Sequence, residues 1–155
     1  MLRLRSTSTN KLGPLFCLLA IAASSVAYAT EPSGENWHRD WDSALAASQE
    51  QGRPILCFVT MGDGCYYCEK MVRSTYSDPR VLEEIDRDFV LASIDSNRHP
   101  QIAKKLKVRL FPTTVIVGVD AKVIDSKAGY AGPDQLRSWL KTAATKNPTA
   151  NIASR

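Results

Sequence analysis

Apolar and polar positions along the chain mark out helices and strands, beginning near residue 40. Trp41–Gln51 carries apolar side chains at helical spacing and is followed by Gly52 and Pro54, a pattern typical of an amphipathic helix with a firm stop. Residues 54–60, PILCFVT, form a continuous apolar run, which is typical of a short strand buried on both faces. The pattern therefore predicts a helix that leads into a buried strand.

The rest of the chain continues this alternation. Further helices are predicted at 66–76, 78–88, 100–107 and 132–144, and further strands at 89–95, 113–119 and 122–126. The last two strands are joined by a tight turn at Asp120 and Ala121. Alternating segments of this kind predict an α/β fold with a central mixed sheet, flanked by helices on both faces and closed by an antiparallel hairpin.

The first thirty residues have the features of a secretory signal peptide. Three basic residues precede an apolar run at 12–21, and the small-residue sequence AYA follows at 27–29. A membrane anchor is the alternative, but the run falls short of the ~20 apolar residues that a spanning helix needs. We therefore expect residues 1–29 to be removed, and the mature chain to be periplasmic or secreted with no stable membrane insertion.

Removal of the leader changes the charge of the chain. It takes away three basic residues and no acidic one, so the formal charge falls from +4 to +1 over the remaining 126 residues. We expect one domain at 30–144 and a disordered polar tail at 145–155. Lys104, Lys105 and Lys107 are interpreted as a solvated helix face, so no nucleic-acid partner is predicted.

Two of the three cysteines in the mature chain are only three positions apart, at Cys65 and Cys68. Cysteines of exported proteins usually form disulfides, yet a bridge across so short a loop adds little stability. A metal site would need four ligands, and the chain has no second C-x-x-C, so no metal is predicted. Cys57, inside an apolar strand, is interpreted as an inert core residue.

The pair follows a strand and a glycine-containing turn, at the start of a predicted helix. A helix N-terminus carries about half a positive charge and unpaired N–H groups, which favour a thiolate there. Thiols in such settings have pKa values of ~3.5 to 7.5 instead of ~8.5. We expect Cys65 to attack a substrate disulfide, and Cys68, on the same helix face, to resolve the mixed disulfide.

The motifs in their order resemble the thioredoxin fold over residues 37–141. The segments that carry the resemblance are GRPIL, CYYCEKM, FVLASID, LKVRLFPTTVIV and GY. They are similar to exported thioredoxin-like domains of the disulfide-reducing and isomerising kind. The resemblance implies protein disulfide and thiol substrates, and no bound cofactor, because the disulfide itself carries the electrons.

The resemblance also implies roles for three residues outside the cysteine motif. From the residues alone, Pro112 is simply a strand-start proline. In the thioredoxin family the matching proline is cis and packs beside the cysteines, and the backbone of the preceding residue, here Phe111, pairs with an extended substrate. Gly129 matches the glycine that lets the chain pass close to the pair.

The chain departs from thioredoxin at several positions. The buried aspartate of the strand before the cysteines is replaced by Cys57 or Val59, depending on the alignment, and Glu69 stands where thioredoxin has lysine. Tyr66 and Tyr67 replace the Gly-Pro dipeptide. At an exposed helix start they are either substrate contacts or simple surface, and the sequence leaves both open.

Charges near the motif predict the direction of electron flow. Neither residue between the cysteines is a cation, and Asp63 and Glu69 place negative charge on both sides, so a reductant or isomerase is favoured over a strong oxidant. Such a protein needs an electron source, such as a membrane reductant. The alternative is a non-enzymatic partner-binding module. The three tryptophans are interpreted as packing residues: Trp37, Trp41 and Trp139.

Overall fold

The computed structural model describes residues 31, 32, 34 and 36–146. The predicted signal peptide and most of the predicted tail lie outside these residues. In chain order the elements are β1 (Trp37–His38), α1 (Trp41–Gln51), β2 (Ile55–Thr60), α2 (Tyr66–Ser74), α3 (Pro79–Asp88), β3 (Val90–Asp95), α4 (Pro100–Lys105), β4 (Thr113–Val117), β5 (Val123–Ala128) and α5 (Pro133–Lys146).

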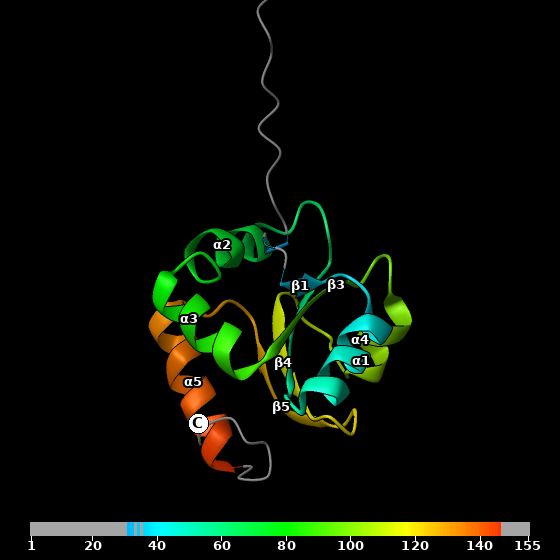
Figure 1. Ribbon diagram of the computed structural model, residues 1–155. Coiled ribbons are helices and arrows are strands. Elements are labelled where there is room, and N and C mark those ends of the chain that lie inside the picture. Colours follow the sequence, from blue (N-terminus) through cyan, green and yellow to red (C-terminus); the bar gives the residue numbers. More distant parts are fainter. Residues whose placement is uncertain (1–30, 33, 35, 147–155) are drawn as a thin grey trace, which may run out of the picture.

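The sheet has the strand order β1-β3-β2-β4-β5. β3 pairs in parallel with β1 and β2, whereas β4 pairs antiparallel with β2 and β5. The parallel pair β2 and β3 needs a crossover, which α2 and α3 supply. In Figure 1, α1 and α4 lie on one side of the sheet, and α3 and α5 on the other. The predicted mixed sheet with helices on both faces is confirmed.

Two apolar clusters fill the space between the sheet and its helices. On one face Leu56 and Phe58 pack with residues of α2, α3 and α5, and on the other Cys57 and Val59 pack with residues of α1 and α4. The alternation along β2 follows from the two-residue period of a strand, and β2 is buried on both faces as predicted. Of the tryptophans, two are buried and one is partly buried against the core: Trp37, Trp41 and Trp139.

The helix boundaries are encoded locally. At the start of α1 the Ser43 N–H donates to the Asp40 carboxylate at 2.8 Å, and Gly52 ends the helix in a left-handed conformation with φ 63°. At the start of α3 the Asp78 side chain caps the helix, and Pro79 occupies its first turn, where no N–H is needed. These signals explain why both helices were predictable.

Several boundaries differ from the prediction. β1 was missed, because a strand of two residues has no periodicity to read. β4 ends at Val117 instead of residue 119, because the turn begins with the Gly118 N–H donating to the Lys122 carbonyl. β5 consequently runs over Val123–Ala128, and α2 and α4 each end two residues earlier than predicted. α5 continues to Lys146, two residues into the predicted tail.

Candidate active site

The two close cysteines form a disulfide at the start of α2. Cys65 caps the helix and Cys68 lies in its first turn, with their Cα atoms 5.2 Å apart. Cys65 is 6% exposed and Cys68 is fully buried. Cys65 is therefore the less buried of the two cysteines, in keeping with its place at the very start of the helix.

One backbone N–H at the helix start donates to the Cys65 sulfur, and the next donates to the Cys65 carbonyl. The Cys68 N–H donates to Cys65 Sγ at 3.3 Å, and the Glu69 N–H donates to the Cys65 carbonyl at 3.0 Å. Because the dipole of α2 adds positive potential at this end, negative charge on Cys65 Sγ is stabilised when the disulfide opens. The arrangement is suited to a nucleophilic thiolate.

The loop between β2 and α2 is tied to the end of β3. The Gly62 N–H donates to Thr60 Oγ1 at 3.1 Å, and the Asn97 side chain donates to the Met61 carbonyl. Gly62 has φ 78°, and a Cβ built there would lie 2.8 Å from a carboxylate oxygen of Asp95. This position requires glycine both for its backbone angle and for the close approach.

Strand register gathers the other predicted site residues at the same edge of the sheet. Thr113 pairs with Val59 near the end of β2 and with Ala128 at the end of β5. Pro112 and Gly129, which adjoin these paired residues, therefore lie at the edge from which the cysteine loop departs. The Gly129 N–H donates to the Pro112 carbonyl at 2.8 Å, and Gly129 has φ 83°.

Phe111 connects the two faces of the core at this edge. The Phe111–Pro112 peptide bond is cis. The Phe111 side chain is partly buried and packs against both apolar clusters, including the one that contains Cys65 and Cys68. Phe111 is therefore placed next to the cysteine side of the core, while its role toward substrate stays a prediction.

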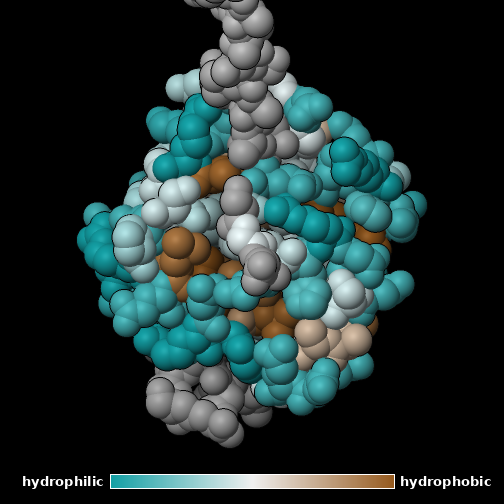
Figure 2. All heavy atoms as spheres, turned by 45° about the horizontal axis from the view of Figure 1, so that its top comes forward, coloured by the Kyte–Doolittle hydropathy of each residue, from teal (hydrophilic) through white to brown (hydrophobic). Residues whose placement is uncertain are grey.

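The two tyrosines of the motif lie on the surface of the α2 end. Tyr66 is 63% exposed and Tyr67 is 56% exposed, and their rings make an edge-on contact with centroids 5.3 Å apart. Tyr130 extends this aromatic surface, with its ring 6.5 Å from that of Tyr67 and Lys70 Nζ 4.7 Å above it. The sequence does not identify Tyr130 as part of this surface, because nothing in it indicates a contact between residues some sixty positions apart. Figure 2 brings this end toward the viewer and shows brown apolar areas separated by teal polar surface.

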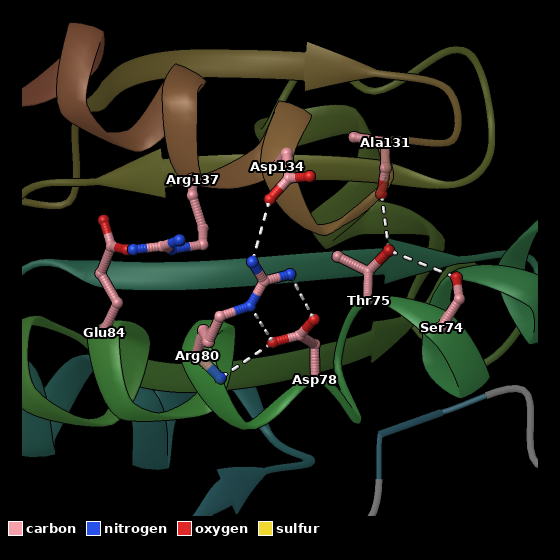
Figure 3. A network of polar contacts seen from close by, with 8 residues as sticks. All are labelled: Ser74, Thr75, Asp78, Arg80, Glu84, Ala131, Asp134 and Arg137. Carbon is pink, nitrogen blue, oxygen red and sulfur yellow. Dashed lines mark hydrogen bonds and ion pairs between the residues drawn. The ribbon is translucent and has the colours of Figure 1, made fainter.

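A polar network fixes the segment that carries Tyr130 against α2. Tyr130 Oη lies 3.1 Å from Ser74 Oγ, and Thr75 Oγ1 donates to the Ala131 carbonyl at 2.7 Å. Figure 3 shows how the network continues between α3 and α5, where two arginines reach across to carboxylates. These ion pairs are Arg80 with Asp134 at 3.4 Å and Arg137 with Glu84 at 2.9 Å. The segment at Tyr130 and Ala131 is thus held by the end of α2, and α5, which follows it, is held by α3.

Charge next to the motif is partly compensated. Glu69 lies 3.6 Å from the Arg73 guanidinium, one helical turn further along α2. Lys70 is engaged over the Tyr130 ring. The negative charge that Glu69 brings to the motif is therefore partly offset by Arg73.

The strand behind the cysteines differs from the expectation in one respect. Cys57 and Val59, the two positions that could match the aspartate of thioredoxin, both have side chains in the cluster on the opposite face. Phe58 lies in the cluster that contains the cysteines. A continuous apolar run carries no signal for which face it turns to α2, so the sequence left this open.

Cys57 lies apart from the redox pair. It is a free, fully buried thiol, and burial raises its pKa to about 12. A thiol with so high a pKa is neutral at physiological pH and a poor nucleophile. This agrees with the interpretation of Cys57 as a core residue.

The described residues offer neither a metal site nor a membrane-spanning helix. Within the described part of the chain, no group of three or more His, Cys, Asp or Glu side chains is arranged to hold a metal ion. Of the histidines, His38 contacts Ser43 Oγ at 3.1 Å and His99 immediately precedes α4. None of the helices described is long and apolar enough to cross a membrane.

Comparison with known sequences links this site to disulfide chemistry. The sequence model of the thioredoxin-like domain family matches residues 41–144. The thiol:disulfide interchange protein DsbD of Pectobacterium atrosepticum is 32% identical over 107 residues, which are 66% of this chain. The match spans 18% of the length of that relative.

Solved structures of the same fold are also similar. A thioredoxin from Thermus thermophilus superposes with a TM-score of 0.65 at 23% identity, covering 75% of this chain and 92% of its own. A DsbH oxidoreductase gives 0.63 at 18% identity, with 74% and 87% coverage. The oxidised C-terminal domain of DsbD from Neisseria meningitidis gives 0.55 at 19% identity, with 68% and 97% coverage.

Proposed function

Because the chain belongs to the thioredoxin-like domain family and carries a disulfide at the start of α2, we propose that it is an exported thiol–disulfide oxidoreductase acting on protein substrates. The observation that carries this proposal is the geometry of the pair. Cys65, with 6% of its surface exposed, accepts a backbone hydrogen bond at a helix N-terminus, and Cys68 is fully buried in the first turn of the same helix. This is the arrangement that disulfide exchange requires.

In the reducing direction the reaction has two steps. The Cys65 thiolate attacks one sulfur of a substrate disulfide, the substrate S–S bond breaks, and the leaving sulfur takes a proton from solvent. Cys68 then loses its proton and attacks Cys65 Sγ, which forms the Cys65–Cys68 disulfide and releases the second substrate thiol. Two electrons pass to the substrate, and no bound cofactor is needed.

Site residues outside the pair position the substrate. The backbone of Phe111, next to Pro112, pairs with an extended polypeptide, and Gly129 keeps the neighbouring loop close to the pair. Tyr66 and Tyr67 contact the substrate, which is supported by their exposure beside Cys65. These assignments rest on the shared sheet edge and on the family resemblance.

The direction we propose is reduction or isomerisation, after removal of residues 1–29 and export to the periplasm or beyond. Neither residue between the cysteines is cationic. The nearby Arg73 guanidinium is paired with Glu69, so its positive charge is partly neutralised and does little to stabilise a Cys65 thiolate. A membrane electron donor would keep the pair reduced in an oxidising compartment. The similarity to part of DsbD, a thiol:disulfide interchange protein, supports thiol–disulfide exchange as the chemistry of the pair.

Trapping of mixed disulfides tests the proposal. Cys68→Ser should accumulate mixed disulfides with substrate proteins on non-reducing gels, because the bond to Cys65 is no longer resolved. Cys65→Ser, the matched control, should trap none, because the remaining sulfur is buried. Trapping by Cys65→Ser alone would reverse the roles.

The reduction potential tests the direction. Equilibration of the full chain against glutathione buffers should give a potential below about −200 mV, whereas a value near ~−120 mV would identify a strong oxidant. The non-enzymatic alternative is separated by Cys65→Ser/Cys68→Ser, since a binding module keeps its partner while an oxidoreductase loses all turnover.

A further inference from the structure

A groove with basic walls lies beside Phe111, on the side of the sheet that α1 and α4 cover. Its volume is about 560 Å³, and its lining comprises Ser96, Pro100, Ala103, Lys104, Lys107, Val108, Arg109 and Phe111. It thus extends from the end of β3 along α4 to the residue before Pro112. None of these lining residues is acidic.

The charge of this region contrasts with the rest of the domain. Residues 31–146 contain sixteen basic and sixteen acidic residues, so their formal charge is zero. Between Asp95 and Asp120, however, the chain has five basic residues and no acidic one. A neutral domain with this distribution has a locally positive surface, which attracts negative charge over about a Debye length.

Three cations of this segment line the groove. Lys104, Lys107 and Arg109 are exposed, and none is within ion-pair distance of a carboxylate among the described residues. Asp95, the acidic residue nearest in sequence, accepts from the Asn97 N–H at 2.8 Å and lies 3.5 Å from Arg98. Because Asp95 is already paired with Arg98, it does not neutralise the positive charge of the groove.

The three lysines interpreted as a solvated helix face are all exposed, but Lys107 lies beyond the end of α4. Lys105 turns away from the groove and lies with Nζ 5.3 Å from the centre of the Trp41 ring. Lys107, just past the end of α4, has a left-handed backbone with φ 58°, and its N–H donates to the Lys104 carbonyl at 3.0 Å. This tight turn ends α4 and brings the chain to Arg109 and Phe111.

We propose that this groove binds an acidic segment of the substrate protein, next to the cysteine that undergoes exchange. The inference rests on the proposed function, because it concerns the partner of the same site. An extended polypeptide that pairs with the Phe111 backbone passes the groove, since Phe111 forms part of its wall. Aspartate or glutamate side chains there meet Lys104, Lys107 and Arg109, which speeds encounter more than it tightens the final complex.

The test compares two peptides that each contain one disulfide, flanked by glutamates in one and by glutamines in the other. The full chain is reduced, freed of reductant and mixed with each peptide at about 0.02 M and about 0.5 M salt, conditions of weak and strong screening. At low salt the glutamate peptide should be reduced roughly tenfold faster, and at high salt the difference should fall below about twofold.

Charge reversal locates the effect. Lys104→Glu/Arg109→Glu should lower the low-salt rate ratio to below about twofold, with the glutamine peptide as the internal reference. The matched control, Lys122→Glu/Lys141→Glu, makes the same change of charge in the β4–β5 turn and on α5, and should keep the tenfold ratio. Equal rates for both peptides with the unmodified chain, or a ratio that survives in Lys104→Glu/Arg109→Glu, would overturn the proposal. The proposal would also be overturned if inorganic phosphate slowed the reduction of both peptides equally and the glutamate peptide showed no faster reduction.

A binding arm separates this inference from the proposed function. With Cys65→Ser/Cys68→Ser in the full chain, peptide binding is followed by NMR titration without exchange chemistry. If the unmodified chain reduces no disulfide but glutamate-selective binding is present and is lost on reversal of Lys104 and Arg109, the proposed function fails and the docking groove stands. Absence of glutamate-selective binding overturns the groove, whatever the redox activity.

Discussion

The relative stability of the oxidised and reduced chain is a direct measure of the direction in which the pair works. The Cys65–Cys68 bond closes a loop of four residues, for which the chain-entropy relation gives about 2 kcal/mol in favour of the oxidised form. Interaction of a Cys65 thiolate with the start of α2 stabilises the reduced form by roughly 0.3 to 1 kcal/mol. The oxidised chain should therefore be more stable by about 1 kcal/mol, which corresponds to about 20 mV.

Guanidinium chloride unfolding at neutral pH measures this difference. The experiment uses Cys57→Ala in both redox states, so that the third thiol cannot exchange with the pair once it is exposed by unfolding. The midpoint should shift without a change in the slope m, since both native states bury similar surface. As a control, addition of reductant to Cys65→Ser/Cys68→Ser should change nothing. A reduced chain more stable than the oxidised one by over about 1 kcal/mol would refute the reasoning, because that is the property of a strong oxidant.

Three further predictions concern the stability of the domain. Gly62→Ala should lower the free energy of unfolding by roughly 1 to 3 kcal/mol, because Gly62 has φ 78° and the added Cβ would lie 2.8 Å from a carboxylate oxygen. The control, Gly52→Ala, should lower it less, because Gly52 has φ 63° but no atom lies within 4 Å of the added Cβ. The buried hydroxyls of Tyr76 and Thr114 lie 2.8 Å apart. Tyr76→Phe and Thr114→Val should each lower the free energy of unfolding by about 1 to 3 kcal/mol, and the double variant should lower it by less than the sum of the two. Additive effects would contradict the hydrogen bond. The pKa of Asp78 is lowered to about 2, chiefly by the side-chain hydrogen bond from the arginine two residues on, so its contribution is present above the unfolded value of ~3.9 and is lost as the pH falls toward 2. Asp78→Asn should flatten the pH dependence of unfolding in that window, and parallel curves would rule this out.

Local patterns were sufficient for most of the fold. Capping residues such as Asp40 and Asp78 and the apolar run of β2 identify their elements without reference to the rest of the chain, because each signal acts within a few residues. The position of Cys65 at a strand-to-helix junction was readable for the same reason. Prediction was weakest where pairing with another strand determines the secondary structure. The two residues of β1 form a strand only because they lie beside β3.

The sequence by itself determined the chemistry available to this protein: two cysteines one helical turn apart, at the start of a helix, with a proline and a glycine further along. Only the tertiary structure decided what surrounds that chemistry. The register of β2, β4 and β5 places Pro112 and Gly129 at one edge, and the packing of β2 turns Phe58, rather than Cys57 or Val59, toward the pair. A continuous apolar strand carries no local mark of which face meets which helix, and contacts between distant residues are fixed only when the sheet closes. The tertiary structure also brings Lys104, Lys107 and Arg109 together around one groove, although residues 31–146 have no net formal charge.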